Sequence, residues 1–164
     1  APTRGLMGYT SRFLTLTKGT GVINRIFHGY GKFEGEMDGR KNGALISMAN
    51  GKAVAFAIFN LQARGEMFVT HNDPVYEGMI VGLAPKPGDM IINVMKGKQL
   101  TNMRTQGTDE NVVLTPVRQM SIAEQLSMLN TDEALEITPK SLRLRKAILN
   151  PTERKKNEKS GTPL

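Results

Sequence analysis

A polar stretch at positions 96–108 holds the residues best suited to chemistry, and their types suit contact with RNA. Its lysines and arginine can neutralise phosphates, and its hydroxyl and amide side chains can hydrogen-bond phosphate, base or 2′-OH groups. The RNA-binding candidates are Lys96, Lys98, Thr101, Asn102, Arg104 and Gln106. The stretch has no aromatic residue for base stacking, which favours recognition of backbone and shape over sequence. A solvated loop has the same composition, so the residues alone leave both interpretations open.

Two other groups of cations form a secondary basic patch in this interpretation. One group lies in the opening segment, which contains no acidic residue before position 34, and the other lies near the C-terminus. The members of the patch are Arg4, Arg12, Lys18, Arg25, Arg143, Arg145 and Lys146. For the C-terminal group, a solvated run of charge is the favoured explanation.

No pattern of catalytic or metal-ligating residues is found in the sequence. The chain lacks the Gly-x-x-x-x-Gly-Lys-Ser/Thr loop that cradles nucleotide phosphates, and it lacks cysteine. Neither His28 nor His71 has a second ligand at the spacing that metal sites use. Asp132 and Glu133 are adjacent, and adjacent residues do not face each other on a helix or strand, so helix capping or solvation is expected for them. The sequence therefore predicts no catalytic site, no metal site and no cofactor bound by this chain.

The composition favours a folded protein with a polyanionic partner. The chain has 164 residues, a net charge of +7 and 39% hydrophobic residues, enough to bury a core. No apolar run approaches the roughly 18 residues of a membrane span. The absence of cysteine fits a reducing compartment, and a cytoplasmic location is expected.

Local patterns predict a mostly β chain with a few helices. Helical spacing of apolar residues favours a helix over 3–18, and a strand follows over 22–30. Asn50-Gly51 between two apolar runs predicts a hairpin of strands 44–48 and 52–59, although a helix is also compatible with the alanines of the second run. Shorter strands are expected over 66–70, 79–83 and 90–95.

The C-terminal third has two clear local signals. Ser121 and Glu124 form a capping box, which predicts a helix of about three turns. A hairpin of strands 134–138 and 141–145 is expected around Pro139-Lys140. Asn150-Pro151 can start a short helix, but the basic tail is expected to fray.

Several motifs in register resemble the BipA/TypA family of ribosome-binding translational GTPases. The resemblance covers nearly the whole chain and fades after about residue 150. The motifs are PTRGLMG at 2–8, NGALIS at 42–47, VYEGMIVG at 75–82, KGK at 96–98, LTNMR at 100–104 and TPKSLRLRK at 138–146.

The resemblance implies an α+β fold in three parts. Residues 1–31 would be the second half of a domain-V-like αβ unit of the kind found in elongation factor G. Residues 32–150 would be the family-specific C-terminal domain, mostly β and barrel-like, with one or two helices. Residues 151–164 would be a basic, disordered tail.

The resemblance also implies partners and an activity. The expected partners are the ribosome, large-subunit rRNA, the acceptor end of A-site tRNA and the N-terminal domains of the parent protein, with no membrane partner. GTP hydrolysis, with GTP and magnesium, would belong to an N-terminal domain that this chain lacks. Roles in large-subunit assembly, cold growth and stress responses follow from the family. The alternative is a protein-interaction module that docks on the parent GTPase domains without touching RNA.

Overall fold

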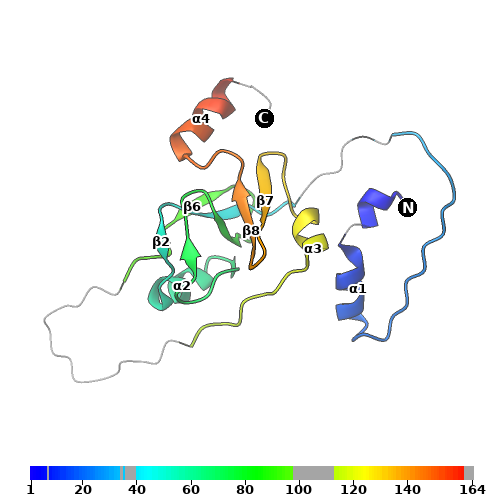
Figure 1. The fold of residues 1–164 in the computed structure, drawn as a ribbon, viewed down its shortest axis with the longest axis horizontal. Coiled ribbons are helices and arrows are strands. Elements are labelled where there is room, and N and C mark those ends of the chain that lie inside the picture. Colours follow the sequence, from blue (N-terminus) through cyan, green and yellow to red (C-terminus); the bar gives the residue numbers. More distant parts are fainter. Residues whose placement is uncertain (7, 34, 36–39, 98–112, 161–164) are drawn as a thin grey trace, which may run out of the picture.

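The computed structural model describes residues 1–6, 8–33, 35, 40–97 and 113–160 (Figure 1). Within these residues the chain forms short helices and three small sheets, which confirms the α+β class. None of the described helices is long and apolar enough to cross a membrane.

The main sheet has the strand order β3-β5-β1-β6 and is centred on β1. β1 (Ala44–Ser47) pairs antiparallel with β5 (Ile80–Leu83) and parallel with β6 (Met90–Ile92), and β3 (Glu66–Met67) lies on the other side of β5. All four residues of β1 are buried, as expected for a central strand. The strands expected over 66–70, 79–83 and 90–95 are confirmed in shorter form.

The expected barrel is wrong. The main sheet leaves β3 and β6 as edges, and the other two described sheets have two strands each, so none closes on itself. A barrel requires a closing pair between its first and last strands, which these short strands do not make.

The hairpin expected from strands 44–48 and 52–59 is also wrong. Gly51–Lys52 forms β2, which pairs with β4 (Pro74–Val75) and not with β1. The second run then becomes a helix, α2 (Ala55–Gln62). The chain bends at Ala49 and Asn50, Gly51 already lies in β2, and the segment joins strands that belong to two different sheets.

The burial pattern of α2 explains why the helix forms. Ala57, Ile58 and Leu61 are buried, and this spacing is that of one helix face and not of a strand. His71 caps the start of the helix, because its Nδ1 accepts a hydrogen bond from Ala55 N at 3.2 Å. Alanine also has the highest helix propensity.

The larger apolar core lies between the main sheet and α2. Leu45, Val81 and Val94 have no exposed surface, and Ile58 of α2 is 1% exposed. Met95 and Leu114, which border the polar stretch at 96–108, pack against the same core.

The helix expected over 3–18 is divided into two pieces. Residues Thr3–Leu6 form a 3-10 helix, η1, and Tyr9–Leu16 form α1. Gly8 separates them with a φ of 72°, in the left-handed region that favours glycine. A Cβ at Gly8 would lie 2.8 Å from Ser127 Oγ, so this position also requires glycine for close packing.

The strand expected over 22–30 does not form. A strand requires a neighbouring strand to take its backbone hydrogen bonds, and none of the described residues provides one. Ile26 is 93% exposed and Tyr30 is fully exposed, so this segment has no apolar partner in the described structure either.

The capping box at Ser121 and Glu124 is confirmed. Glu124 N donates to Ser121 Oγ at 3.3 Å, and Ser121 N donates to Glu124 Oε2 at 3.0 Å. The helix that it starts, α3, covers only Ile122–Ser127 and is shorter than the three turns expected.

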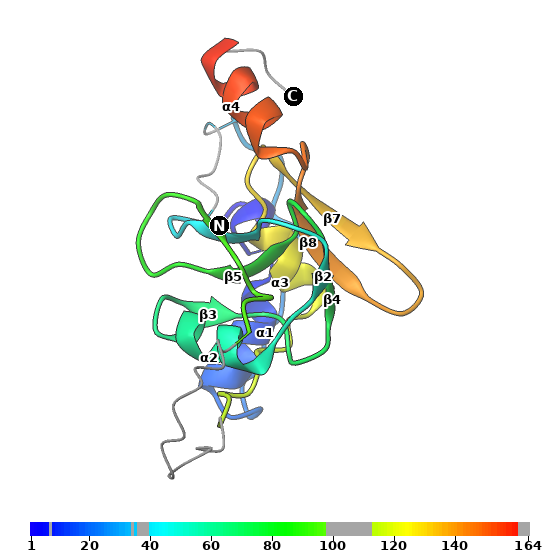
Figure 2. The same cartoon turned by 90° about the vertical axis from the view of Figure 1, so that its left-hand side faces the viewer.

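The C-terminal hairpin is confirmed. β7 (Glu133–Ile137) and β8 (Leu142–Lys146) pair antiparallel, and Figure 2 shows the hairpin standing out from the main sheet. Leu144 joins a second apolar cluster with residues of β1 and β5. Lys146 N donates to Gly78 O at 2.9 Å, which fixes the base of the hairpin beside β5.

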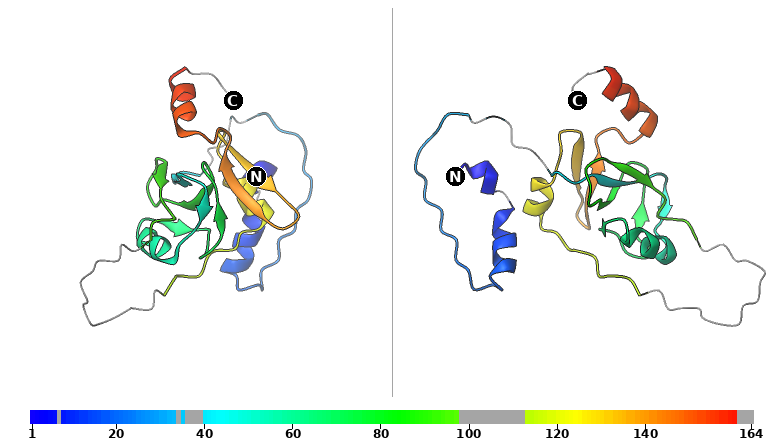
Figure 3. Two further views of the ribbon diagram at one scale, coloured as in Figure 1. Left: turned by 60° about the vertical axis from the view of Figure 1, so that its left-hand side comes forward. Right: turned by 180° about the vertical axis from the view of Figure 1, so that it is seen from behind.

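The tail is helical where disorder was expected. Pro151–Ser160 form α4, which has no buried residue and projects from the remainder of the structure (Figure 3). Asn150 caps it, because its Oδ1 accepts from Thr152 N at 2.8 Å and Glu153 N at 3.3 Å. Residues 161–164 lie outside the described residues.

Candidate nucleic-acid interface

The primary RNA-binding candidates fall mostly outside the described residues. Lys96 is described and exposed, whereas Lys98, Thr101, Asn102, Arg104 and Gln106 lie in the range 98–112 that is not described. The structure does describe the residues on either side of this range, up to Gly97 and from Val113, and shows which elements hold them. The terms outgoing end and returning end refer to these two flanks.

The outgoing end of the stretch is attached to the start of α2. Val94 is buried, and its carbonyl accepts a hydrogen bond from Val54 N, the residue before α2, at 2.9 Å. Asn93 Oδ1 accepts from Met95 N at 2.9 Å, and the Met95 sulfur lies directly against Gly51. Lys96 therefore leaves the domain from a fixed backbone position.

The returning end is attached to the other end of α2. Gln62 Nε2 donates to Thr115 O at 3.0 Å, and Thr115 N donates to Gln62 Oε1 at 3.2 Å. α2 has 8 residues, which corresponds to a length of about 12 Å. The helix lies between the outgoing and the returning residues (Figure 1). Its length therefore sets the distance between the two points at which the stretch is attached to the domain, which we call the base of the stretch.

Two cations near this base were not predicted from the sequence. Lys52 follows Gly51 in β2, and Arg64 follows the C-terminal end of α2; both are exposed and make no ion pair with described residues. No local signal marks them, because tertiary packing decides their positions. Lys52 follows Gly51, which lies against Met95, and Arg64 lies near the α2 end that holds Thr115.

The secondary basic patch is not one surface. Figure 1 shows α1 and β8 apart, with α3 between them. In the opening segment, Arg4 lies 4.9 Å from the Phe33 ring centroid and Arg25 donates to Thr10 Oγ1 at 2.6 Å. These two arginines stabilise local structure, while Arg12 and Lys18 are exposed.

The C-terminal members of the patch are also engaged within the protein. Arg143 makes an ion pair with Glu136 at 3.7 Å, and Arg145 donates to the carbonyls of Lys146 and Ala147. Lys146 is only 2% exposed, so it is not part of a basic surface. In β8, Arg143 and Arg145 lie on one face of the strand. Lys146 lies on the opposite face, together with Leu142 and the buried Leu144.

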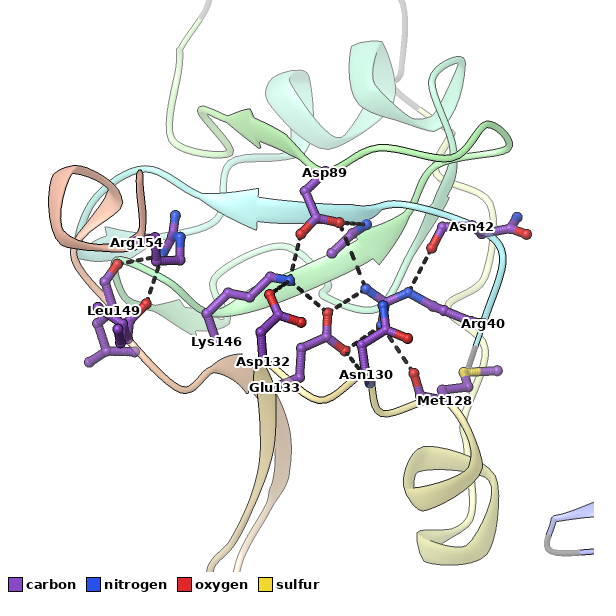
Figure 4. Close-up of polar contacts among 12 residues, drawn as sticks. Arg40, Asn42, Asp89, Met128, Asn130, Asp132, Glu133, Lys146, Leu149 and Arg154 are labelled. Carbon is purple, nitrogen blue, oxygen red and sulfur yellow. Dashed lines mark hydrogen bonds and ion pairs between the residues drawn. The ribbon is translucent and has the colours of Figure 1, made fainter. Parts of the chain in front are cut away.

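Lys146 is the centre of a buried ion-pair cluster (Figure 4). Its Nζ lies 2.5 Å from Asp89 Oδ2, 2.6 Å from Asp132 Oδ2 and 2.9 Å from Glu133 Oε1. Arg40 adds a second cation, which donates to Glu133 through two nitrogens at 2.7 and 2.5 Å. The expectation of solvation or capping is therefore wrong for Glu133, whose side chain has no exposed surface. Asp132 pairs with Lys146 but keeps a side-chain exposure of 45%.

The cluster joins segments that are far apart in the sequence. Arg40 precedes β1, Asp89 precedes β6, and Asp132 and Glu133 begin the hairpin whose last residue is Lys146. Arg40 also donates to the carbonyls of Asn42 and Met128 at 2.8 and 3.2 Å. The cluster thereby fastens the hairpin and the end of α3 to the main sheet.

The environment shifts two pKa values in this cluster in opposite directions. Burial alone would lower the pKa of Lys146, but hydrogen bonds to Asp132, Asp89 and Glu133 outweigh it and raise that pKa. Burial alone would raise the pKa of Asp89, but hydrogen bonds from Lys146 and Ala44 N, with the nearby charges, hold it below its usual range. Both shifts favour the charged forms.

The carboxylates of Asp89, Asp132 and Glu133 are close enough to hold a metal ion, since their oxygens lie within 4.8 Å of one another. The Lys146 ammonium contacts all three of them, so it already neutralises the group. The cluster is accordingly a structural ion-pair network.

Tyr76, which lies between β4 and β5, connects that segment to strand β7 of the hairpin by a hydrogen bond. Its hydroxyl donates to Glu136 Oε2 at 2.6 Å. Burial, followed by this hydrogen bond, raises the pKa of Tyr76 to about 12.

Among the described residues, ion pairs involve a larger share of the carboxylates than of the cations. Six acidic residues share only four cations in ion pairs. The acids are Glu66, Asp89, Glu124, Asp132, Glu133 and Glu136, and the cations are Arg40, Arg118, Arg143 and Lys146. More described cations than described carboxylates therefore remain without an ion-pair partner.

We expect Lys146→Met to destabilise the fold strongly. The substitution removes one of the two cations that pair with Glu133, whose side chain has no exposed surface, and it leaves only Arg40 for the three carboxylates. Breaking a buried ion pair by removing one partner costs about 3 kcal/mol or more. Urea unfolding monitored by circular dichroism measures the effect, with Lys159→Met on exposed α4 as the matched control. An equal loss in both variants would contradict the role of the cluster.

The cluster also predicts how stability depends on pH. The lowered pKa of Asp89 provides stability that is present above the ordinary carboxyl range and is lost as pH falls through the lowered value. The raised pKa of Lys146 provides stability that is present below the ordinary lysine range and is lost as pH rises through the raised value. The unfolding free energy should be level from about pH 5 to 9 and fall outside that range. Asp89→Asn should flatten the acid limb; an unchanged acid limb would contradict this assignment.

We expect Gln62→Ala to release the returning end of the 96–108 stretch. The substitution removes both hydrogen bonds to Thr115, which are worth about 1 kcal/mol each at most in an exposed setting. Hydrogen exchange at the Thr115 amide should accelerate, while exchange at the buried Val94 end stays unchanged. Asn60→Ala, on the same helix, is the control because Asn60 donates only to Phe56 O.

Comparison with known proteins identifies the family. A family model described as the TypA/BipA C-terminal domain matches residues 42–151. The large ribosomal subunit assembly factor BipA of Buchnera aphidicola is 47% identical over 162 residues, which cover 98% of this chain and 27% of that protein. The factor of the same name from Bacillus subtilis is 46% identical over 159 residues, which cover 96% of this chain and 26% of that protein. The chain spans about a quarter of the length of these curated relatives. It belongs to the TypA/BipA family, within the C-terminal part that the family model describes.

Proposed function

We propose that this chain is the RNA-contacting C-terminal region of a factor that acts in assembly of the large ribosomal subunit. The names of its relatives support a ribosome-associated role. In this proposal the chain contacts large-subunit rRNA and the acceptor end of A-site tRNA. The parent protein acts in the cytoplasm, in ribosome assembly and in adaptation to cold and stress.

The observation that carries the proposal is the number of exposed cations without an ion-pair partner beside the 96–108 stretch. Six of the described carboxylates are in ion pairs, whereas Lys52, Arg64 and Lys96 are exposed and make no ion pair with described residues. Phosphates are the ligands that such unpaired cations favour. The contact residues proposed within the stretch are Lys96, Lys98, Thr101, Asn102, Arg104 and Gln106.

The way the 96–108 stretch is attached to the domain suits RNA binding at a defined position. The described residues on either side of it are hydrogen-bonded to α2 or to the residue before it, through Val94 and Thr115, and Met95 and Leu114 pack against the larger core. With its flanking residues held in this way, the stretch leaves and rejoins the domain at fixed positions. In this proposal, GTP and magnesium are bound by an N-terminal domain of the parent.

We expect Lys98→Ala combined with Arg104→Ala to weaken binding to large ribosomal subunits. With about four phosphates neutralised, the logarithm of the binding constant should fall with a slope of roughly 3 to 4 against the logarithm of salt concentration. The double variant should reduce that slope by about 2, because two phosphate contacts are lost. Co-sedimentation over a salt series measures both quantities.

Lys155→Ala combined with Lys159→Ala on α4 is the control for this experiment. It removes the same charge from a helix at a distance from α2 (Figure 3). Equal weakening by both double variants would indicate attraction without a specific surface, and unchanged binding by the first would exclude the stretch as the contact.

A protein-docking function is the second candidate, and the opening segment favours it. Ile26, Phe27, Tyr30 and Phe33 are each more than 70% exposed, which is typical of a surface that a partner covers. The expected partner is the remainder of the parent protein, including its GTPase domain. Binding of the chain to those domains, with no binding to ribosomal RNA, would favour this function over the first.

A further inference from the structure

A groove separates the main sheet from the hairpin and is not used by the proposed RNA contacts. It has a volume of about 950 Å³ and lies between the start of β5, the residues after β3 and the turn of the β7–β8 hairpin. Residues 116–120, which lead from the returning end of the stretch to α3, form its remaining wall. The projecting hairpin in Figure 2 gives the groove its outer side.

The 116–120 wall has backbone groups available for a partner. These residues form neither helix nor strand, and in the described structure Val117, Arg118 and Gln119 make no backbone hydrogen bond. Met120 O accepts only a long bond of 3.4 Å from Gln125 Nε2. A segment with unpaired donors and acceptors can pair with an added extended chain, as edge strands do.

Gln125, beside the groove, has a side-chain oxygen without a hydrogen-bond partner. It is 8% exposed and borders the groove, and its Oε1 is buried without a hydrogen-bond partner. A buried acceptor without a donor is costly, and such groups are rare in native structures. Because Gln125 itself lines the groove, a partner bound there would lie beside this residue.

The charge and apolar character of the lining define the partner. The charged residues of the lining are Arg118, Lys140 and Arg143, and the lining includes no carboxylate. Arg118 pairs with Glu66 and Glu124, and Arg143 pairs with Glu136, so Lys140 is the cation of the lining that is left for an acidic partner. Lys140 makes no ion pair with any described residue. Ile122 and Ile137, also in the lining, are 47% and 62% exposed, so the groove offers apolar surface beside its cations.

We propose that this groove binds an extended peptide segment of a partner protein in which acidic residues alternate with apolar ones. The alternation matches a strand, whose successive side chains point to opposite sides. The apolar side chains of the peptide would pack on Ile122 and Ile137, and its acidic side chains would face Lys140. RNA fits less well, because the lining has Phe68 as its single aromatic residue and that ring is partly buried.

The proposal goes beyond RNA binding and does not depend on it. The probe is a peptide of about eight residues with alternating glutamate and valine, a typical strand length. Titration into the full chain, followed by NMR, should shift the amide signals of Val117, Arg118 and Gln119. The same peptide with lysine in place of glutamate should bind more weakly by at least about fivefold.

Two variants test the two halves of the lining. Lys140→Glu at the hairpin turn and Ile137→Ser on β7 should each weaken binding of the glutamate-valine peptide by about fivefold. Both positions are at the surface, so the fold should be kept, and Lys159→Glu on α4 is the control that should leave binding unchanged.

Three results would overturn the proposal. The first is equal binding of the lysine and glutamate peptides, and the second is a set of shifted amides that excludes residues 116–120. The third is displacement of the peptide by a single-stranded RNA oligonucleotide, which would assign the groove to nucleic acid. Loss of ribosome binding in the Lys98→Ala and Arg104→Ala variant bears on the proposed function alone and leaves this test unaffected.

Discussion

The charge of Lys146 must be neutralised inside the protein, and much of the domain is arranged around that requirement. An ammonium group with 2% exposure is stable only when carboxylates replace its water. Asp89, Asp132 and Glu133 do so from two separate parts of the chain, and Arg40 completes the balance from a third. Because each partner lies at the end of a strand or just before one, the network fixes how the hairpin meets the main sheet.

That arrangement has consequences at the surface. With the hairpin fixed at its base, its turn projects and one wall of the groove is created beside β5. Of the carboxylates that hold Lys146, Glu133 is buried, while Asp89 and Asp132 keep side-chain exposures of 35% and 45%. The network therefore fixes the groove wall from the inside and also reaches the surface.

α2 has a comparable role at the opposite side of the sheet. Its buried face, which includes Ile58 and Leu61, packs on the core, and its two ends hold the two ends of the 96–108 stretch. Val54 and Gln62 provide those attachments by backbone and side-chain hydrogen bonds respectively. The stretch is therefore presented by a packed helix and not by the loop sequence itself.

Local signals in the sequence determined several parts of this structure. The Ser121–Glu124 capping box and the C-terminal hairpin depend on residues close in sequence, and the family motifs do not require a fold to be recognised. The tertiary structure alone decided that Ala55–Gln62 is a helix, because alternating alanines permit either element and packing selects one. It also decided that Lys146 is buried: its sequence neighbours are basic, and only contacts from residues 13 to 57 positions away reveal its carboxylate partners. A charge pattern specifies which groups can pair, whereas the fold specifies which of them meet.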